Sequence, residues 1–588
     1  MARTGQEGPE MESVAVYLQG VAKYLLGKFY GADGPPWGTS LSRLEDLVFS
    51  VQQSLAREFF TLALNLQAQQ SSLAPDSLLR CPSCRLEISC SDSQARSLIS
   101  RVGVAAWREP AAYCSVCRRS YFPQSRSLGI DQTGLAPSVV RKVISCGSRC
   151  RSFAETSDLL LELSGLDIDP KAVERLIHLV GQERVDERDR RTACFLALPL
   201  AEKFTTPAGV AAPDLAVVMV DGGRLQIRKP PGLKSQADAE PCKPSAGPCA
   251  SSDEDAEKPE DQDQQKKDGH WREDKVALLL PMSSETFTCD PCPDIPPGFL
   301  VRARMAKLVR ELGKKVPNRG EPSEPEEEAE EQDKVLQEKS AYVPPTPGCR
   351  KVLASRLVWP EFAVVVASEA WSLGFQGAKR KAFVGDGSDN NWEVHRRFFG
   401  SFTCVLDFIH ALSYVHAAAQ ADRSAVQGFK VYRRWITWLW AGQVTKVIEE
   451  LTLSQKEIGE VKDEDGESSP RRVVGDSLRY LSNHQDMMKY DEYRKAGLPI
   501  TSSLMESTVK QINHRVKGTE KFWTEEGAEA ILQLRADQIS EDDQMDQFYR
   551  RRETEASGQR RYRRSKDSAA TRQQPRQKQK SRVRASSA

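Results

Sequence analysis

The sequence lacks several features that would assign a large chain to a class at once. Its 588 residues contain no apolar run near the ~18 residues that a membrane-spanning helix needs. The N-terminus has no basic stretch followed by an apolar one, so no secretory signal is predicted. There is no GxxxxGK[ST] nucleotide loop and no repeat at solenoid spacing. We therefore expect a protein of a reducing compartment, in the cytoplasm and associated with the nucleoid.

A large net charge is also missing, because the formal charge of +1 results from blocks of opposite sign. Residues 316–345 include a strongly acidic stretch, which we interpret as a linker. Residues 230–272 are polar and rich in Pro and charge, so we expect a disordered insertion between two hairpin strands. Residues 541–588 are rich in Lys and Arg, as in disordered tails that contact nucleic acid phosphates.

Periodicity and composition divide the remaining chain into helical and mixed regions. Apolar residues at helical intervals predict N-terminal helices, and alternating strand-like and helical patterns later in the chain predict a mixed α/β region. The predicted regions are an N-terminal helical region at 1–75, a zinc-ribbon-like region at 76–125, a helical region at 136–192, and a mixed region at 210–540 with a helical insertion at 411–495.

Fourteen cysteines in a reducing compartment favour metal ligation or burial over disulfides. Cys81 and Cys84, and then Cys114 and Cys117, form two CxxC pairs with the spacing of a four-thiolate zinc site, which is typical of structural zinc. The loop between the pairs exceeds the usual ~15–20 residues, so we expect a longer hairpin or a small insert in an otherwise irregular segment. The alternative is four buried free cysteines. Cys90 is less favoured as a ligand than these four. We expect structural or incidental roles at Cys146, Cys150, Cys289 and Cys292.

Residues 152–183 predict two short helices joined by the turn SGLDID. Pro170 stands at the first position of the second helix, with Asp169 as its N-cap. The pattern is typical of a helix-turn-helix, whose second helix enters the DNA major groove. An ordinary helical hairpin is the alternative, because the second helix carries few basic residues besides Lys171 and Arg175.

Two apolar runs each end on an aspartate beside glycine. LAVVMVDGG ends on Asp221 and AFVGDG ends on Asp386; Asp389 is the alternative acid in the second motif. Carboxylates at the ends of neighbouring strands suit divalent cations such as Mg²⁺. The glycines would let bulky phosphates approach the backbone.

A third acid, Glu506, lies in the predicted helix SSLMESTVKQINHRVKG. At ~100° per residue, it shares a polar arc with Lys510, Asn513 and Lys517. An apolar stripe lies about a quarter-turn away, at Val509, Ile512 and Val516. The arc would combine a carboxylate with amines for DNA phosphates; a solvated Glu–Lys face is the alternative.

An Asp on a first strand, an Asp on a later strand and then a Glu on a helix resemble the DDE transposases. The resemblance is closer to insertion-sequence transposases of the ISKra type, distant relatives of the Mutator-like group, and spans about residues 76–550. It is carried by the segments YCSVCRRSYFP, VDGGRLQIRK, FVGDGSDNNW, LDFIHALSYV, MESTVKQINHRVKG and FWTEEGAEAILQLRA. It implies an α/β multidomain protein whose RNase H-like core, a mixed sheet, has a helical insertion before the Glu.

The resemblance also implies roles for matching positions. Asp221, Asp386 and Glu506 would hold two Mg²⁺ (or Mn²⁺) ions for DNA cleavage and strand transfer at the ends of the element. The partners would be double-stranded DNA and further copies of the chain in a synaptic complex. Supporting or DNA-positioning roles are implied for Asp407, His410, Trp392 and Lys510.

The chain departs from the resemblance before Glu506, where Thr501, Ser502 and Ser503 stand in place of frequent glycines. Two other functions stay open. A catalytically inactive or domesticated transposase would be a zinc-containing DNA-binding protein. A housekeeping nuclease would cut DNA without regard to end sequence.

Overall fold

The computed structural model describes residues 8–71, 74–228, 270–312 and 343–559. Most of the 230–272 insertion and of the 316–345 linker, and the end of the basic tail, lie outside the described residues. The chain forms two compact units, Met1–Val140 with Tyr549–Ala588 and Arg141–Phe548. Within the described ranges, no helix is both long and apolar enough to cross a membrane.

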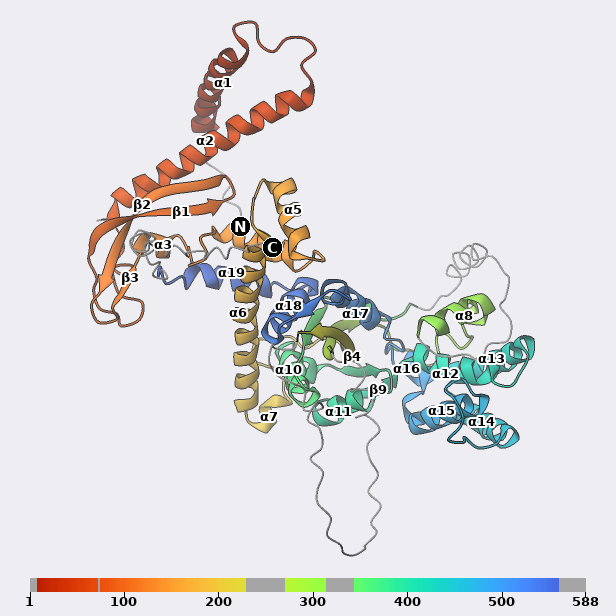
Figure 1. The fold of residues 1–588 in the computed structure, drawn as a ribbon. Helices are drawn as coiled ribbons and strands as arrows, with labels where there is room; N and C mark the ends of the chain where they lie inside the picture. Colours follow the sequence, from red (N-terminus) through yellow and green to blue (C-terminus); the bar gives the residue numbers. More distant parts are fainter. Residues whose placement is uncertain (1–7, 72–73, 229–269, 313–342, 560–588) are drawn as a thin grey trace, which may run out of the picture. The chain divides into compact units, whose positions relative to one another are not determined.

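The first unit combines long helices with a three-stranded antiparallel sheet (Figure 1). Its main elements are α1 (Gly8–Tyr30), α2 (Leu41–Gln69), β1 (Cys90–Ser100), β2 (Gly103–Cys114), β3 (Arg119–Tyr121) and α3 (Pro123–Ser127). β1 and β2 form the longer hairpin expected between the CxxC pairs, so the prediction of an irregular segment at 76–125 is wrong for residues 90–114. Gly103 turns this hairpin with a φ of 106°, a conformation that favours glycine.

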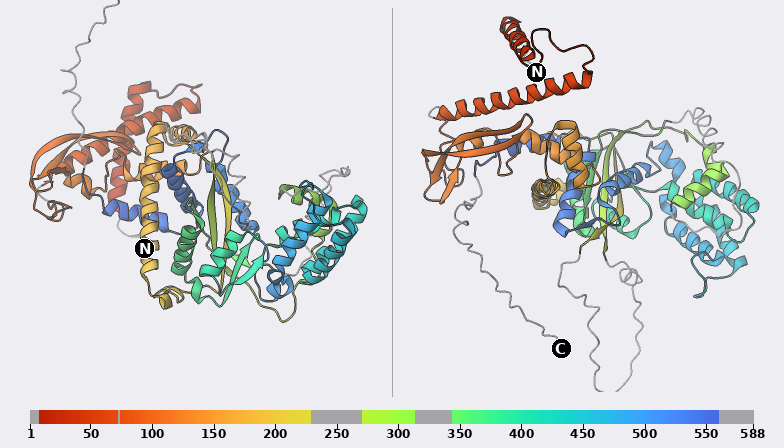
Figure 2. Two further views of the ribbon diagram at one scale, coloured as in Figure 1. Left: turned by 60° about the horizontal axis from the view of Figure 1, so that its bottom comes forward. Right: turned by 45° about the horizontal axis from the view of Figure 1, so that its top comes forward.

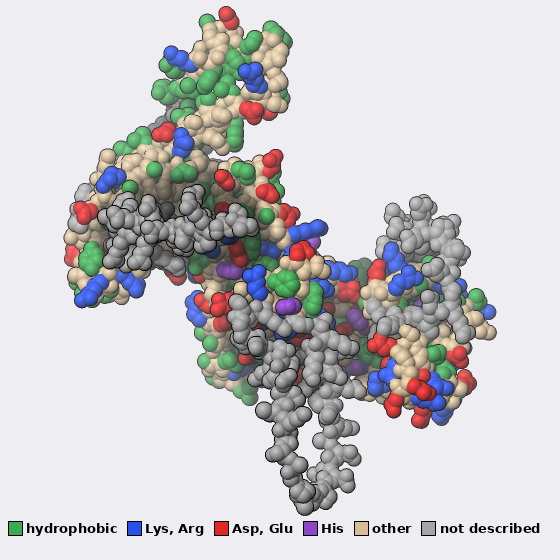
Figure 3. All heavy atoms as spheres, in the orientation of Figure 1, with side chains coloured by type: hydrophobic (Ala, Val, Ile, Leu, Met, Phe, Trp, Pro, Cys, Tyr) green, Lys and Arg blue, Asp and Glu red, His purple; other side chains and the backbone are tan. Residues whose placement is uncertain are grey.

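Helix α2 has two different faces. Leu64 is buried where α2 packs on β2, and the Gln124 side chain donates a hydrogen bond to its carbonyl oxygen at 2.8 Å. Away from this contact, apolar residues recur at intervals of seven. They are more than half exposed: Leu41 71%, Val48 59%, Leu55 53% and Leu62 57%. Figure 3 shows hydrophobic side chains on the surface over α1 and α2. Helix α2 therefore carries an exposed apolar stripe.

The second unit begins with the helices α4 (Pro137–Gly147, which starts in the first unit), α5 (Phe153–Ser164), α6 (Pro170–Ala197) and α7 (Leu200–Lys203). Asp169 caps α6 through a hydrogen bond from the Lys171 N–H, as predicted. The second helix is not short, however, because α6 continues to Ala197 and packs on α18 (Glu525–Ile539).

Buried arginines explain the length of α6. Arg184 and Arg188 belong to the buried face of its second half, together with Val185 and Phe195. Arg184 forms an ion pair with Asp537 of α18 at 2.9 Å, and Arg188 pairs with Glu529 at 2.7 Å. Buried charges need such partners. Because the acids lie more than three hundred residues away, the pattern of residues 152–183 could not reveal them.

A mixed sheet of seven strands forms the centre of the second unit, confirming the mixed α/β class (Figure 2). The main order is β6-β5-β4-β8-β9; β7 also pairs with β5, and β10 with β4. Strand β5 is antiparallel to both β4 and β7, whereas β4, β8 and β9 run parallel. The bounds are β4 (Leu215–Ile227), β5 (Trp271–Ser283), β6 (Thr346–Pro347), β7 (Lys351–Ser355), β8 (Arg380–Gly385), β9 (Thr403–Leu406) and β10 (Phe522–Trp523).

Helices follow the strands in the second half of the chain. Helices α12 to α16 lie together in Figures 1 and 2, and the 284–312 segment packs on them: the Tyr432 hydroxyl donates to the Phe299 carbonyl oxygen at 3.0 Å. The elements are η4 (Pro297–Leu300), α8 (Arg302–Glu311), α10 (Trp359–Ser372), η5 (Phe375–Gly377), α11 (Asp389–Phe398), α12 (Phe408–Gln420), α13 (Ala425–Trp440), α14 (Val444–Ile458), α15 (Pro470–Asn483), η6 (Gln485–Met487), α16 (Tyr490–Lys495), α17 (Ser503–Val516) and α19 (Gln544–Thr554).

Strand β9 ends at Leu406, because Asp407 accepts a hydrogen bond from the Ile409 N–H and caps α12. One boundary differs from the sequence predictions. The tail predicted to be disordered from residue 541 begins with helix α19.

Candidate functional site

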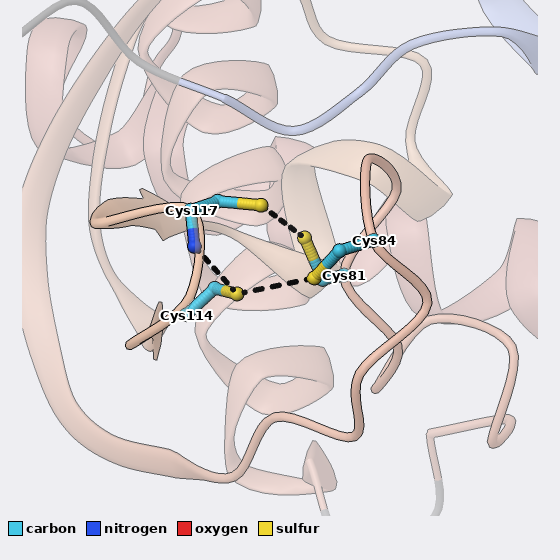
Figure 4. A group of neighbouring side chains, drawn as sticks. All are labelled: Cys81, Cys84, Cys114 and Cys117. Carbon is cyan, nitrogen blue, oxygen red and sulfur yellow. Dashed lines mark hydrogen bonds between the residues drawn. The ribbon is translucent and has the colours of Figure 1, made fainter.

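The first unit brings the two CxxC pairs together as predicted (Figure 4). One ligand atom from each of Cys81, Cys84, Cys114 and Cys117 lies within 4.8 Å of the others. The Cys81 and Cys117 sulfurs are 3.7 Å apart, and those of Cys84 and Cys114 are 3.5 Å apart. This group could hold a structural zinc ion, since four thiolates close the tetrahedral coordination sphere. Cys90 packs against the buried core that contains Cys81 and Cys114, and it is not one of the four grouped sulfurs.

The local backbone explains how each pair presents its sulfurs. The residue after each pair has a positive φ, 64° at Arg85 and 52° at Arg118. This left-handed residue closes a tight turn, and the Cys117 N–H points at the Cys114 sulfur at 3.4 Å. Burial raises the pKa of the Cys81 thiol, but hydrogen bonds with Tyr121 and the backbone outweigh it and lower that pKa to about 6. A lowered pKa favours the thiolate, the form that binds metal.

In the second unit, parallel strands carry two acids to the same edge of the sheet. β4 pairs with β8 from Leu215 with Arg380 to Met219 with Val384. Two residues further along each chain stand Asp221 and Asp386. The sequence had suggested that the strand ends at Asp221. Instead, β4 continues to Ile227 along β5, beyond the point where β8 stops.

Hydrogen bonds fix the loop that carries Asp386. One of its carboxylate oxygens accepts from the Ser388 N–H at 3.0 Å and from the Asn391 side chain at 2.8 Å. Asn391 is buried on α11, five residues after the acid. The alternative acid, Asp389, is exposed at the start of α11. These contacts hold the Asp386 carboxylate in one orientation, and they favour Asp386 over Asp389 as the candidate metal ligand of this motif.

Helix α17 packs on β4 and β5 and carries the third acid. Met505 and Ile512 are buried, and Glu506, about a third of whose side chain is exposed (34%), lies beside this buried face. Lys510, one turn later, has its amine 3.8 Å from the Glu506 carboxylate and is largely exposed. The amphipathic arrangement of this helix was predicted from its sequence.

Electrostatic effects link the three acids. Burial, and then the negative charge of Asp386, raise the pKa of Asp221 to about 6. Glu506 raises it further, while the Gly222 N–H and His410 act in the opposite direction. Like charges disfavour ionisation at short range, so the acids converge on one region. Their oxygens do not all approach within 4.8 Å, however; among the described residues only the cysteine cluster does.

A buried carboxylate after the third parallel strand braces this region. Gly385 pairs with Leu406, and Asp407 follows directly. Asp407 is buried; it binds Nδ1 of His410 at 2.9 Å and accepts a hydrogen bond from the Ser502 hydroxyl. Ser502 is the N-cap residue of α17. Asp407 therefore ties the end of β9 to the start of the helix that carries Glu506.

His410 responds to the same acids. Burial alone would lower its pKa, but the hydrogen bond and charge of Asp407 raise it above the ordinary value. The charges of Asp386 and Glu506 act in the same direction. His410 therefore lies within electrostatic reach of the three converging acids. Trp392 is buried on α11 against the Phe383 ring of β8, with a centroid distance of 5.9 Å, and supports this strand.

Two neighbours of this region were missed from the sequence. Tyr480 of α15 donates its hydroxyl to the Asp386 carbonyl oxygen at 2.5 Å. A Cβ on Gly387 would lie 2.7 Å from the Tyr480 ring. Asp274 of β5 lies opposite Gly223, where an added Cβ would come within 2.7 Å of its carboxylate. The prediction that the glycines leave room for phosphates is thus wrong at Gly223 and Gly387, because the protein's own side chains fill the space.

Nothing in the sequence near Tyr480 signals its role, since the contact spans 94 residues. Asp274, by contrast, could have been found by pairing the two hairpin strands. Comparison with protein-family models and with curated proteins finds no match to this chain.

Proposed function

We propose that this chain is a metal-dependent DNA transposase that cleaves DNA and transfers strands at the ends of its own insertion sequence. One observation carries the proposal. Two parallel neighbouring strands set Asp221 and Asp386 in register, and α17 brings Glu506 close enough to influence the same carboxyl group.

The arrangement of elements supports an RNase H-like core of the kind that the resemblance implies. The first acid lies on a central strand, the second follows a parallel neighbour, and the third is on a helix against the sheet. The helices α12 to α16 stand between the second and third acids in the chain. This is the order of the DDE transposases, including the helical insertion before the Glu.

The donor set fits divalent cations. Mg²⁺ and Mn²⁺ prefer oxygen ligands. Burial, and then repulsion from Asp386, raise the pKa of Asp221, and a cation would relieve that repulsion. The three carboxylates do not share one 4.8 Å sphere; Asp221, Asp386 and Glu506 would together hold two ions, as the resemblance implies. Two ions bound there would activate a water or 3′-hydroxyl and stabilise the leaving oxygen.

The chain's own residues orient this chemistry. Ser388 and Asn391 fix the Asp386 carboxylate, and Asp407 holds His410 and the start of α17. Lys510, largely exposed beside Glu506, is placed to meet a DNA phosphate. Double-stranded DNA is the proposed partner, and a synaptic complex of several copies is the proposed working state.

Metal-dependent cleavage of DNA that carries the element's ends tests the proposal. The wild-type chain should nick such DNA with Mg²⁺ or Mn²⁺, and Asp386→Asn should abolish nicking while sparing DNA binding. Asp389→Asn, which changes an exposed acid three residues away, is the matched control and should cleave normally. Equal cleavage by Asp386→Asn would remove Asp386 from the site, and cleavage indifferent to end sequence would indicate a nuclease.

A second candidate is a zinc-containing DNA-binding protein derived from a transposase. The cysteine cluster favours this candidate, since a structural zinc site can stabilise a DNA-binding protein that has no catalytic activity. It predicts salt-sensitive DNA binding without metal-dependent cleavage. Inverted repeats around several copies of the gene would favour an active element, whereas a single copy without repeats would favour this second candidate.

A further inference from the structure

Basic side chains from distant parts of the sequence meet at one corner of the second unit. Arg149 and Arg151 lie in the turn between α4 and α5, His514 in the last turn of α17, and Lys521 just before β10. Nε of Arg151 is 3.1 Å from Nε2 of His514, and Nζ of Lys521 is 3.5 Å from the His514 carbonyl oxygen. We call these four residues the basic corner.

Two further arginines brace the basic corner from within. The buried Arg515 donates from Nε to the Gly147 carbonyl oxygen at 2.9 Å and stacks near the Phe153 ring, at 4.8 Å from its centroid. Arg535 of α18 donates to the Ser148 and Gln511 carbonyl oxygens, at 3.3 Å and 2.9 Å. The turn before α5 is therefore fixed to α17 and α18 by hydrogen bonds.

The basic corner carries more cations than nearby acids: the charges of Glu155 and Glu520 act on it, against those of Arg149, Arg151 and Lys521. None of its four residues forms an ion pair with an acid in the described ranges; Arg149 and Arg151 bond to Ser145 and His514 instead. Glu155, the acid of this turn, is occupied at the start of α5, where it accepts from the Arg151 N–H at 2.6 Å.

Repulsion within the basic corner supports this description. Desolvation, and then the charge of Arg151, lower the pKa of His514. Desolvation and the charge of Arg515 lower the pKa of Lys521. Like charges at short range disfavour one another's charged forms, so an anion bound here would relieve this repulsion. Nη2 of Arg515 has no hydrogen-bond partner among the described residues.

We propose that the basic corner binds backbone phosphates of the DNA strand that enters the carboxylate site; this rests on the proposed function. His514 follows Glu506 by eight residues on α17, about 12 Å at ~1.5 Å per residue. A strand advances ~3.4 Å per nucleotide along the duplex axis. The basic corner therefore holds the strand about three to four nucleotides from the bond that is cut.

Salt-dependent binding tests this proposal in the non-cleaving Asp386→Asn chain with duplex DNA. Arg149→Gln with Arg151→Gln should lower the slope of log affinity against log salt by about two, and weaken binding roughly tenfold on any sequence. The matched control is Arg396→Gln with Arg434→Gln. Both are exposed arginines of the same unit that pair with acids, Glu393 and Glu450. This control should keep the slope.

An unchanged slope in the Arg149/Arg151 variant would overturn the proposal that the basic corner binds phosphates. Should that variant fold poorly by circular dichroism, Lys521→Gln alone decides, with an expected decrease of about one. Cleavage by the otherwise wild-type chain separates the two proposals. Cleavage together with an unchanged slope would support the proposed transposase function and contradict phosphate binding by the basic corner. A lowered slope without any cleavage would support phosphate binding and contradict the transposase function.

Discussion

The cysteine cluster of the first unit and the carboxylate region of the second bring ligand residues together in different ways. Each pair of cysteines is made by one tight turn, so only the hairpin between them has to fold before all four sulfurs meet. The acids come from two strands and a helix spread over nearly three hundred residues, and their oxygens stay further apart. A site assembled over such a distance depends on supporting residues that a local site does not need.

The largest expected effect concerns the local site. Cys114→Ser should reduce bound zinc from about one ion per chain to none and unfold the β1–β2 hairpin, because a structural zinc contributes about 10–16 kcal/mol to folding. Zinc analysis and hydrogen exchange of the two units would measure this, with β4 and β5 of the second unit expected to stay protected.

Cys90→Ser is the matched control for that experiment. Cys90 packs against the buried core that contains Cys81 and Cys114 and is not one of the four grouped sulfurs, so its replacement should leave zinc bound. Retention of zinc by Cys114→Ser, or equal loss in the Cys90 variant, would contradict the assignment of ligands.

The sequence predicted more of the cysteine cluster than of the carboxylate region, because the cysteine pairs are local in the sequence and the acids are not. CxxC spacing is a local property, and it gave all four sulfurs. The sequence also showed that Asp221 and Asp386 each follow an apolar run, but the parallel register of their strands came only from the structure. Tyr480, however, reaches Asp386 from 94 residues away, and only packing of α15 creates that contact.

Buried charges were equally hidden from the sequence. Arg184 continues the core of α6 only because Asp537 lies opposite it. The pairing of Gly223 with Asp274 follows from the predicted hairpin, but the burial of the Asp274 carboxylate could not be seen from it. Prediction failed where the environment of a side chain depends on a partner distant in the sequence.

The support around the carboxylate region should matter nearly as much as the acids. Asp407→Asn keeps a capping side chain but removes the charge that holds His410. We expect a 10- to 100-fold loss of metal-dependent activity, as for other outer ligands. The pKa of His410 should fall, because Asp407 now raises it; an NMR titration would measure this.

Ser502→Ala separates two of the three contacts of the Asp407 carboxylate. It removes the hydrogen bond to the start of α17 but leaves the carboxylate beside His410, so the His410 pKa should stay raised. An unchanged His410 pKa in Asp407→Asn would show that this carboxylate does not hold the histidine.

A buried carboxylate without support offers the opposite case. Asp274 is fully buried, its oxygens have no hydrogen-bond partner among the described residues, and burial raises its pKa to about 6. An acid with a higher pKa in the folded chain favours folding at low pH, and this contribution is lost as pH rises from about 4 through about 6.

Asp274→Asn should therefore be more stable than the wild type at pH 8, by about 2–3 kcal/mol at ~1.4 kcal/mol per pKa unit, and similar to it at pH 4. Urea unfolding at both values would measure the difference. The exposed Asp389→Asn should show no such gain. An advantage of equal size at pH 4 and pH 8 would mean that ionisation of Asp274 is not its cause.

The smallest expected effect separates the role of the Tyr480 hydroxyl from that of its ring. Tyr480→Phe keeps the ring that covers Gly387 but leaves the Asp386 carbonyl oxygen without its donor, at a cost of about 1 kcal/mol. Cleavage should slow several-fold while DNA binding stays unchanged, because the loop of Asp386 loses one restraint. Tyr480→Ala removes the ring as well and should slow cleavage further. If Tyr480→Phe cleaves like the wild type, packing of α15 against Gly387, rather than the hydrogen bond, positions this acid.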